Sequence, residues 1–330
     1  MTFPWLEHLW FGAYDVVAEV LTPMFLPPFK GSALRGGLSR AFRKLCCIRP
    51  KGSCRTCVLR TACVYSRTFE SPNPLPWHRS PTAPVPYILE PPEEAVEEFS
   101  PGEELRFGLV LVGEACSHLP YFVLALERLG AEMGLGRGKT KGSGRYRLKE
   151  VRQRGGARVY SDGKFHGGGS RRADIWLKER TEGELPGSVC IRFLTPARLH
   201  FKGRNYFPGS DGFRPSVFLE SLYRRLYLLA ALYGDTELPP LQVPAFPDVP
   251  PLDARVSWKD WERYSCRQGT RMKLGGLVGE VVLGEDYRDW FPLIYLGEAL
   301  HVGKATSFGL GRYEVMSSGP ERGGPSHVAL

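Results

Sequence analysis

The stretch GLGRGKTKGSGRY, residues 134–146, recurs as HVGKATSFGLGRY, residues 301–313, at an offset of 167 residues. In both copies an apolar residue and a glycine are followed by five residues that include a base, then by a second pair of glycines and Arg-Tyr. Similarity at a fixed spacing is the signature of a repeated structural unit. The chain has 330 residues, enough for about two domains of ordinary size, so we expect a tandem duplication.

Hydrophobic periodicity around the second copy predicts a clear order of elements. The pattern predicts strands over 189–201, 254–266, 277–283 and 312–316, and helices over 215–233 and 287–300. This order, β-α-β-β-α-β, is the ferredoxin-like arrangement.

The first half shows a looser version of the same order. The pattern predicts strands over 11–21, 105–112 and 145–151, and helices over 31–46 and 120–133. The predicted fold class is therefore α+β, with two tandem ferredoxin-like domains and a Cys-rich insertion in the first. The predicted boundaries are an N-terminal domain at 1–154 with its insertion at 46–101, a flexible basic join at 155–187, a C-terminal domain at 188–316 and a disordered tail at 317–330.

Positive charge is concentrated in two parts of the chain. The net charge is +9, yet residues 30–69 hold ten bases and no acid, and residues 137–180 hold fourteen bases and four acids. An ordinary solvated surface is the alternative, but two long acid-poor stretches favour binding to a polyanion, above all nucleic acid. Aromatic residues suited to stacking on bases lie in or near these stretches, namely Tyr65, Phe69, Trp77, Tyr146, Tyr160, Phe165 and Trp176. Residues 90–104 hold seven acids and no base, and with three prolines they are expected to form a solvent-facing loop.

Five of the eight cysteines lie between residues 46 and 63. Cys47, Cys54, Cys57 and Cys63 are separated by six, two and five residues, and Cys46 is an alternative to Cys47. Two thiolates two residues apart can share one metal ion, and four thiolates complete a tetrahedral site. The spacing favours structural zinc, with an iron–sulfur cluster or unmetallated thiols as the alternatives.

Several other classes do not fit the sequence. The group Gly138-Lys139-Thr140 is not a nucleotide-binding P-loop, because Met133 stands where that motif requires glycine. The longest apolar run is far shorter than the roughly 20 residues of a membrane span. The first residues lack the basic segment of a secretory signal, so we expect a cytoplasmic protein without a membrane partner.

The paired glycine motifs resemble the signature loop of the RAMP proteins of CRISPR systems, which bind guide RNA through paired ferredoxin-like (RRM-like) domains. Arg263-Tyr264-Ser265, MKLGGLVG at 272–279 and the loop at 301–311 are similar to a narrower group, the repeat-processing endoribonucleases of the sixth Cas protein family. PFKGSALRG at 28–36 resembles the turn that opens the first helix in RAMP proteins. The resemblance covers most of the chain, although His301 and Ser143 depart from the loop pattern.

The resemblance implies metal-independent cleavage of CRISPR precursor RNA by attack of a ribose 2′-OH, followed by retention of the guide RNA. Many relatives carry a catalytic His in or near the first helix, but residues 31–46 contain none. Acid–base chemistry needs groups that exchange protons near the cut. The candidate catalytic residues are His166, His200, His301 and Lys30, with Lys30 and Lys304 also expected as phosphate ligands.

Further residues are expected to hold the RNA. They are Arg35, Arg40, Arg43, Arg137, Lys139, Lys141, Arg145, Arg171, Arg172 and Lys304, with Gly303, Gly309 and Gly311 of the second loop. The absence of His from the first helix supports a second reading, a non-catalytic RNA-binding RAMP subunit of a CRISPR effector complex, which would have other Cas subunits as partners. A third class, a zinc-dependent DNA-binding regulator, lacks a helix-turn-helix or a finger with paired His.

Overall fold

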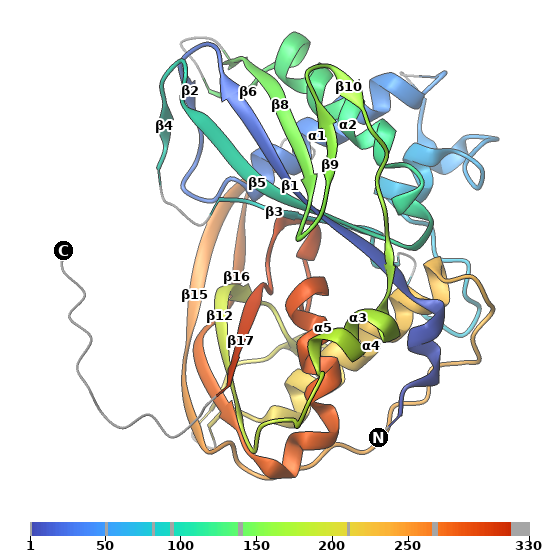
Figure 1. Cartoon of the computed structure of the whole chain (residues 1–330), viewed down its shortest axis with the longest axis vertical. Coiled ribbons are helices and arrows are strands. Elements are labelled where there is room, and N and C mark those ends of the chain that lie inside the picture. The colour runs from blue at the N-terminus through green and yellow to red at the C-terminus, as the bar shows by residue number, and fades with distance from the viewer. Residues whose placement is uncertain are drawn as a thin grey trace.

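The computed structural model describes residues 2–49, 52–80, 83–92, 96–137, 141–209, 212–265 and 270–317. Figure 1 shows two lobes, one built on strands β1, β3, β5 and β8 and the other on β12, β15, β16 and β17. Lys139 and the predicted tail beyond residue 317 lie outside the described residues.

The first lobe is a ferredoxin-like domain. Its elements in chain order are β1 (Trp10–Val20), α1 (Gly31–Cys46), β3 (Tyr87–Glu90), β5 (Glu104–Val112), α2 (Leu119–Arg128) and β8 (Tyr146–Gln153). The strands pair antiparallel in the order β8-β1-β5-β3, which is the 4-1-3-2 order of a ferredoxin-like sheet. The helices cover one face of this sheet, and apolar side chains at helical spacing on α1, such as Leu34, Leu38 and Phe42, are buried there.

The second lobe repeats this topology. It contains β12 (Val189–Ala197), α4 (Pro215–Tyr233), β15 (Asp253–Ser265), β16 (Thr270–Leu283), α5 (Phe291–Leu300) and β17 (Tyr313–Ser317). The sheet order β17-β12-β16-β15 is again 4-1-3-2, with every pair antiparallel. The predicted α+β fold with two tandem ferredoxin-like domains is therefore confirmed.

The two halves share detailed geometry at the repeated stretch. Gly134 has φ 71° and ψ 164°, and His301, 167 residues later, has φ 59° and ψ 167°. The Tyr146 hydroxyl donates to Leu126 O at 2.8 Å, and the Tyr313 hydroxyl donates to Ile294 O at 2.7 Å. The carbonyl in the first half lies one residue farther from its tyrosine, where a π-helical turn, η5 (Leu129–Met133), precedes the loop.

Smaller elements complete the chain. A second small sheet is formed by β2 (Met24–Phe25), β4 (Glu98–Phe99), β6 (Leu135–Arg137) and β7 (Lys141–Gly144), and a short hairpin by β13 (His200–Phe201) and β14 (Arg204–Asn205). The short helical turns are η1 (Pro4–His8), η2 (Cys54–Thr56), η3 (Ser66–Glu70), η4 (Gly113–Cys116), η6 (Glu285–Trp290) and η7 (Thr306–Phe308).

Two parts of the sequence prediction differ from the structure. The insertion was expected to continue to Pro101, but residues 87–90 form β3, a strand of the main sheet. The predicted join at 155–187 contains β9 (Arg158–Ser161), β10 (Lys164–Phe165), β11 (Arg171–Arg172) and α3 (Ala173–Arg180), and its strands extend the first sheet. β3 is buried along its whole length without alternation, so its four residues do not carry the strand pattern that sequence reading relies on.

The two domains share a core. Side chains on the face of the first sheet opposite α1 and α2, namely Phe11, Ile88, Val110 and Val112, are buried in one cluster with the interior of the second domain. Both faces of the end of β5 are therefore covered, which explains its unbroken burial from Phe107 to Val112. This packing fixes one domain against the other.

Candidate functional site

The second glycine loop, residues 301–311, joins the two domains. Its turn η7 lies against the N-terminal end of α1, where a Cβ added to Gly31 would stand 1.9 Å from the carbonyl oxygen of Phe308. Gly309 meets β3 in the same way, because a Cβ there would stand 2.7 Å from Leu89 O. Glycine is required on both sides of this junction, since two backbones meet without space for a side chain.

The other two glycines expected to contact RNA also face protein backbone. A Cβ on Gly303 would stand 2.5 Å from Arg198 O, and one on Gly311 would stand 1.8 Å from Val302 O. Both residues have positive φ, 78° and 71°. Their role in the fold of the loop is therefore explained without a phosphate ligand.

His301 is enclosed in this junction. Its Nε2 lies 3.1 Å from Glu90 Oε1 and its Nδ1 lies 3.1 Å from Leu310 O, and none of its surface is exposed. Arg154 donates to the second oxygen of Glu90 at 2.6 Å. Both ring nitrogens of His301 thus lie within hydrogen-bond distance of acceptors, while burial, the largest cause, lowers the pKa of the ring from 6.5.

Glu90 corrects the expectation of a solvent-facing loop at 90–104. Its side chain is only 3% exposed, because β3 places it between His301 and Arg154. Burial by itself raises the pKa of this carboxyl, but the hydrogen bonds and charges of His301 and Arg154 outweigh burial and hold the pKa well below its usual range. Glu90 is therefore an ionised group that connects the two domains.

Lys30 lies at the start of α1 and is fully buried. Its Nζ lies 3.4 Å from the carbonyl oxygen of Pro28. Nearby, the Arg35 guanidinium lies 4.8 Å from the ring centre of Phe308. Arg35 thus contributes to the contact between α1 and the second loop.

The two remaining histidine candidates lie elsewhere. His166 is exposed and its Nε2 lies 3.0 Å from Ser161 Oγ. His200 is partly exposed on β13. Burial, and then the positive charges of Lys304 and Arg198, lower its pKa from 6.5. Of the four candidates, His200 is the one that combines solvent access with neighbouring cations.

The basic stretch at 137–180 is largely neutralised in the folded protein. Most of its described, exposed arginines and lysines pair with carboxylates from the same stretch and from β1 and β5. The pairs are Arg147–Glu19, Lys149–Glu104, Arg152–Glu150, Arg154–Asp15, Arg158–Glu150, Arg171–Glu179 and Arg172–Asp174. The acid-poor stretch of sequence is therefore not an acid-poor surface. Arg145 donates instead to Ala131 O, and Arg137 and Lys141 lie on β6 and β7.

The first basic stretch retains more free charge. Arg40, Lys44, Arg49, Arg55 and Arg60 are exposed on α1 and in the Cys-rich segment, and within the described part of the chain none of them pairs with a carboxylate. Arg43 is directed inward, donates to Gly52 O at 2.6 Å and lies 5.8 Å from the ring centre of Tyr65. The exposed members form a surface suited to a phosphate backbone.

Sequence reasoning missed a third basic region, on the hairpin β13–β14. Lys202 and Arg204 are exposed there beside aromatic side chains, and Arg198 and Lys304 lie close to His200. The signal was present in HFKGRNYF, residues 200–207, where bases and aromatic residues are interleaved. The sequence pattern places its first residues at the end of a predicted strand. Its few bases are outnumbered by those of the two longer basic stretches.

Most of the aromatic residues expected to stack on bases are structural. Tyr65, Phe69, Tyr146 and Tyr160 are buried in the first core, and Trp176 packs on Phe11. Phe165, in contrast, is 43% exposed. Amphipathic patterning places large aromatic side chains inside the domain, where they bury the most surface.

Three of the cysteine candidates come close together. Cys47 and Cys63 lie close enough to Cys54 to act on it electrostatically, while burial is the main cause that raises the pKa of the Cys54 thiol. Among the described residues, however, no group of three or more His, Cys, Asp or Glu side chains is placed so as to hold a metal ion. The fourth candidate, Cys57, directly follows the short helical turn η2, which begins at Cys54.

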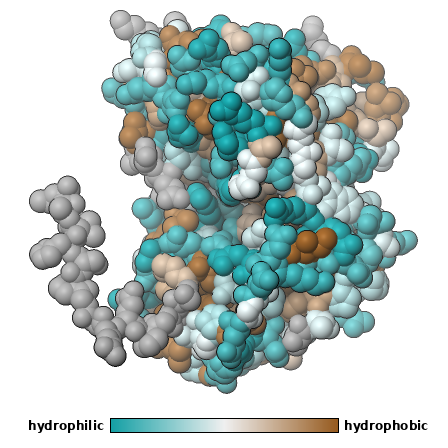
Figure 2. Space-filling model, in the orientation of Figure 1, coloured by the Kyte–Doolittle hydropathy of each residue, from teal (hydrophilic) through white to brown (hydrophobic). Residues whose placement is uncertain are grey.

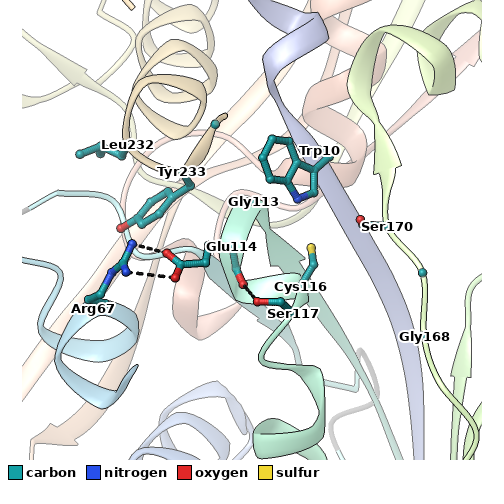
Figure 3. Close-up of a pocket in the computed structure, with 12 residues that line it drawn as sticks. Trp10, Arg67, Gly113, Glu114, Cys116, Ser117, Gly168, Ser170, Leu232 and Tyr233 are labelled. Carbon is teal, nitrogen blue, oxygen red and sulfur yellow. Dashed lines mark hydrogen bonds and ion pairs between the residues drawn. The ribbon is translucent and has the colours of Figure 1, made fainter. Parts of the chain in front are cut away.

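A pocket of about 540 Å³ is lined by residues of both domains, among them Trp10 on β1 and Tyr233 on α4 (Figure 3). Arg67 lines it but pairs with Glu114, and burial raises the pKa of the Cys116 thiol to about 12. The pocket therefore offers neither a free cation nor a reactive thiolate among its lining side chains.

The visible face of the molecule is mostly hydrophilic and is indented where the two lobes meet, with apolar residues in small separate groups (Figure 2). Among the described residues, none of the helices is long and apolar enough to cross a bilayer.

Two family models match the chain. The model of an N-terminal domain, AF_1859_N, matches residues 9–173, and that of the CRISPR-associated endoribonuclease Cas6 matches residues 191–313. No curated protein sequence matches.

Solved structures share the fold at low sequence identity. Two structures of a Cas6-RT-Cas1–Cas2 complex each match 98% of this chain with 13% identity and a TM-score of 0.54. The match spans 48% of the solved chain in one structure and 30% in the other, so this chain covers half or less of those proteins. A Cas6 from Thermus thermophilus matches 93% of this chain and 99% of its own, with 16% identity and a TM-score of 0.46.

Proposed function

We propose that this chain is a CRISPR-associated endoribonuclease of the Cas6 family, which cleaves CRISPR precursor RNA within the repeat and binds the processed guide RNA. The observation that carries the proposal is the match of residues 191–313 to the endoribonuclease family, a segment that contains His200 and the second glycine loop. An RNA substrate also fits action in the cytoplasm.

The reaction uses the RNA's own 2′-OH as nucleophile and requires no metal ion. Attack on the adjacent phosphate forms a 2′,3′-cyclic phosphate and releases the 5′ oxygen of the next nucleotide. A base removes the proton from the 2′-OH, an acid protonates the leaving oxygen, and cations stabilise the charge that develops on the phosphate.

We propose His200 as the acid–base residue at the cut and Arg198 and Lys304 as the cations that hold the phosphate. Burial and these two cations lower the pKa of His200 from 6.5, so the ring is neutral at pH 7 and can accept a proton. His301 and Lys30 are less suited to proton transfer with RNA because both are buried among protein groups. His166 is exposed and stays as the second candidate.

We propose that RNA also contacts the exposed bases of the first basic stretch, with Arg40 as the member predicted from sequence. These side chains carry free positive charge, and each phosphate contact contributes to salt-dependent affinity. Arg171 and Arg172 are weaker candidates because Glu179 and Asp174 already neutralise them.

The test is incubation of the purified protein with labelled repeat RNA in EDTA. The expected result is one cut that leaves a cyclic phosphate, with no cut in a matched RNA that carries 2′-deoxyribose at that position. A cut that requires added metal, or that persists in the deoxy RNA, would contradict the mechanism.

The alternative function is a non-catalytic RNA-binding subunit that works with other Cas proteins. It is favoured by one observation, that α1 contains no histidine and the lysine at its start is buried. The solved complexes in which the related fold occurs contain Cas1 and Cas2, so other Cas subunits are candidate partners here too. Tight binding of repeat RNA without cleavage, for several repeats, would establish this alternative.

We also propose that Cys47, Cys54, Cys57 and Cys63 hold a structural zinc ion. The support is the spacing of the four residues in the sequence. Bound zinc would stabilise a segment with little core of its own, and an iron–sulfur cluster is the second candidate for the same ligands.

Elemental analysis of the purified protein tests the metal. We expect about one zinc per chain, its loss in Cys54→Ser, and its retention in Cys190→Ser, which changes a cysteine outside the cluster. Iron with acid-labile sulfide would identify a cluster, and absence of both metals would contradict the proposal.

A further inference from the structure

The hairpin β13–β14 presents a cation at its tip. His200 pairs with Asn205 and Phe201 with Arg204, so the loop between the strands is the two residues Lys202 and Gly203. Their φ values are 49° and 80°, the left-handed pair of a type I′ turn, a position that favours Asn-Gly. Lysine is thus present at the tip although another residue suits the backbone better.

A pocket of about 570 Å³ lies on one face of this hairpin. Lys202 and Arg204 line it and are exposed, and among the described residues neither pairs with a carboxylate. Arg214 lines the opposite wall and pairs with Asp248 at 3.4 Å, but that carboxylate is 72% exposed and screened by water. Among the described residues, the positive charge of the pocket is therefore offset only by the exposed Arg214–Asp248 pair.

Aromatic rings form the apolar part of the same pocket. Phe207 is 56% exposed, and its ring lies 4.2 Å from that of Trp258 on β15. The cationic groups of Lys202 and Arg214 each lie 5.2 Å from the ring centre of Phe201. An exposed aromatic face beside free cations is the combination that binds an unpaired nucleotide, with the base stacked and the phosphate paired.

Tyr206, the buried residue that follows the hairpin, connects the residues on the two sides of the pocket by hydrogen bonds. The Tyr206 hydroxyl accepts a hydrogen bond from Arg214 N at 2.7 Å and lies 3.3 Å from Gly212 O. The same residue donates its backbone N–H to Leu199 O at 2.9 Å. Tyr206 thus bonds both to the segment that contains Arg214 and to the residue before the hairpin, Leu199.

We propose that this pocket binds one unpaired nucleotide of the RNA, with its base on Phe207 and its phosphate between Lys202 and Arg204. A paired nucleotide does not fit this description, because its base faces are covered by neighbours in an A-form helix. This inference rests on the proposed function, since it assigns a subsite to the same RNA. It adds Phe201, Lys202, Arg204 and Phe207 to the binding surface and places them beside the candidate acid–base residue.

The position of His200 gives the subsite a defined relation to the cut. Successive strand residues point to opposite faces, so His200 and Asn205 lie on one face of the hairpin and Phe201 and Arg204 on the other. An RNA strand that passes over the Lys202 tip would have its scissile phosphate on one face and the bound nucleotide on the other. The subsite would therefore read a nucleotide close to the cut.

The test combines protein variants with single abasic positions in a non-cleavable repeat RNA, the 2′-deoxy form described above. Phe207→Leu removes the stacking ring and keeps an apolar side chain, and we expect Kd to rise about fivefold or more. Abasic substitution at one unpaired position should produce a similar loss in the wild-type protein and no further loss in Phe207→Leu. Phe207→Trp should restore binding.

Two further variants test the cations. Lys202→Asn removes the charge while supplying the residue that a type I′ turn prefers, so the protein stays folded, and Lys202→Arg keeps the charge. Loss of one phosphate contact should reduce the slope of log Kd against log salt by about 0.7, as expected for a single strand. Arg106→Ala, which changes an exposed arginine paired with Glu104, is the matched control and should leave the slope unchanged.

The outcomes separate the two proposals. If the wild-type protein binds repeat RNA but Phe207→Leu and Lys202→Asn bind it equally well, or if no abasic position loses its effect in Phe207→Leu, the subsite is wrong. If the wild-type protein neither binds nor cuts repeat RNA, the proposed function fails first.

Discussion

At the scale of single residues, His301 at the domain junction is the position where the second copy of the repeat differs from the glycine of the first. The first loop has Gly134 at the position where the second has His301, and both adopt the same left-handed backbone. A histidine with positive φ is strained, yet here its ring reaches Glu90 on the other domain. The departure from glycine is thus explained by an interdomain hydrogen bond rather than by contact with RNA.

The Glu90→Gln variant should be less stable at pH 7, by about 3 kcal/mol, because His301 and Arg154 lose a buried ionised partner. The folded-state pKa of Glu90 is lowered, so the carboxylate's contribution is present above the unfolded-state pKa near 4.5 and is lost as pH falls toward the folded-state value. The difference between variant and wild type should therefore shrink below pH 4.5. Urea unfolding at several pH values measures it.

Glu132→Gln is the control for this experiment, since Glu132 forms an exposed pair with Arg128. It should change stability by less than about 0.5 kcal/mol. A Glu90→Gln protein as stable as this control would show that the buried pair contributes nothing.

The His200→Ala variant should cut repeat RNA at least about 100-fold more slowly in single-turnover assays, with little change in Kd, because it removes the proton acceptor and leaves the cations. In the wild type the rate should fall as pH drops below 6.5, since burial, Lys304 and Arg198 lower the pKa of His200 and protonation abolishes the base. His78→Ala is the control. A normal rate in His200→Ala would move the assignment to His166.

At the scale of elements, two glycines of helix α1 differ in their surroundings. Gly31 touches the backbone of the second loop, whereas Gly36, five residues later on the same helix, has no atom within 4 Å of an added Cβ. The same residue type thus has a packing role at one position and none at the other.

The paired substitutions Gly31→Ala and Gly36→Ala should have opposite effects. Gly31→Ala forces α1 away from Phe308 and should destabilise the protein by about 3 kcal/mol, as overpacking does. Gly36→Ala should stabilise it by up to about 1 kcal/mol, because alanine favours the helix. Thermal denaturation of both variants checks this, and equal effects would rule out a close contact at Gly31.

At the scale of the whole molecule, the two ferredoxin-like domains are one cooperative structure. Ile88 is fully buried on β3 in the cluster that also holds the interior of the C-terminal domain. The first sheet therefore lies between its own helices and the second domain, as the two-lobed arrangement in Figure 1 suggests.

Ile88→Ala should destabilise the whole chain by about 2–5 kcal/mol and leave one unfolding transition. Hydrogen exchange should show α4 losing protection together with α1, because the core is shared. Leu124→Ala, at a site 49% exposed on α2, should be nearly neutral. Two separated transitions in the wild type would show that the domains unfold independently.

The duplicated fold could be predicted from local sequence patterns alone. Helices at 31–46 and 215–233 were predicted at their observed bounds, because a 16- or 19-residue amphipathic pattern is long enough to read locally. The glycine repeat also predicted equivalent turns, because positive φ and close backbone approach both select glycine.

Which charged side chains are unpaired and which candidate residues are buried depends on contacts between distant parts of the chain. Acids at 90–104 and bases at 137–180 are far apart in sequence but meet on the first sheet, as Glu104 on β5 and Lys149 on β8 do across β1. Counting charges along the chain therefore overestimated the positive charge of one surface. The same count did not identify the hairpin at 200–205, where no described carboxylate pairs with Lys202 or Arg204. Long-range contacts set burial and ion pairing, and a local pattern carries no information about them.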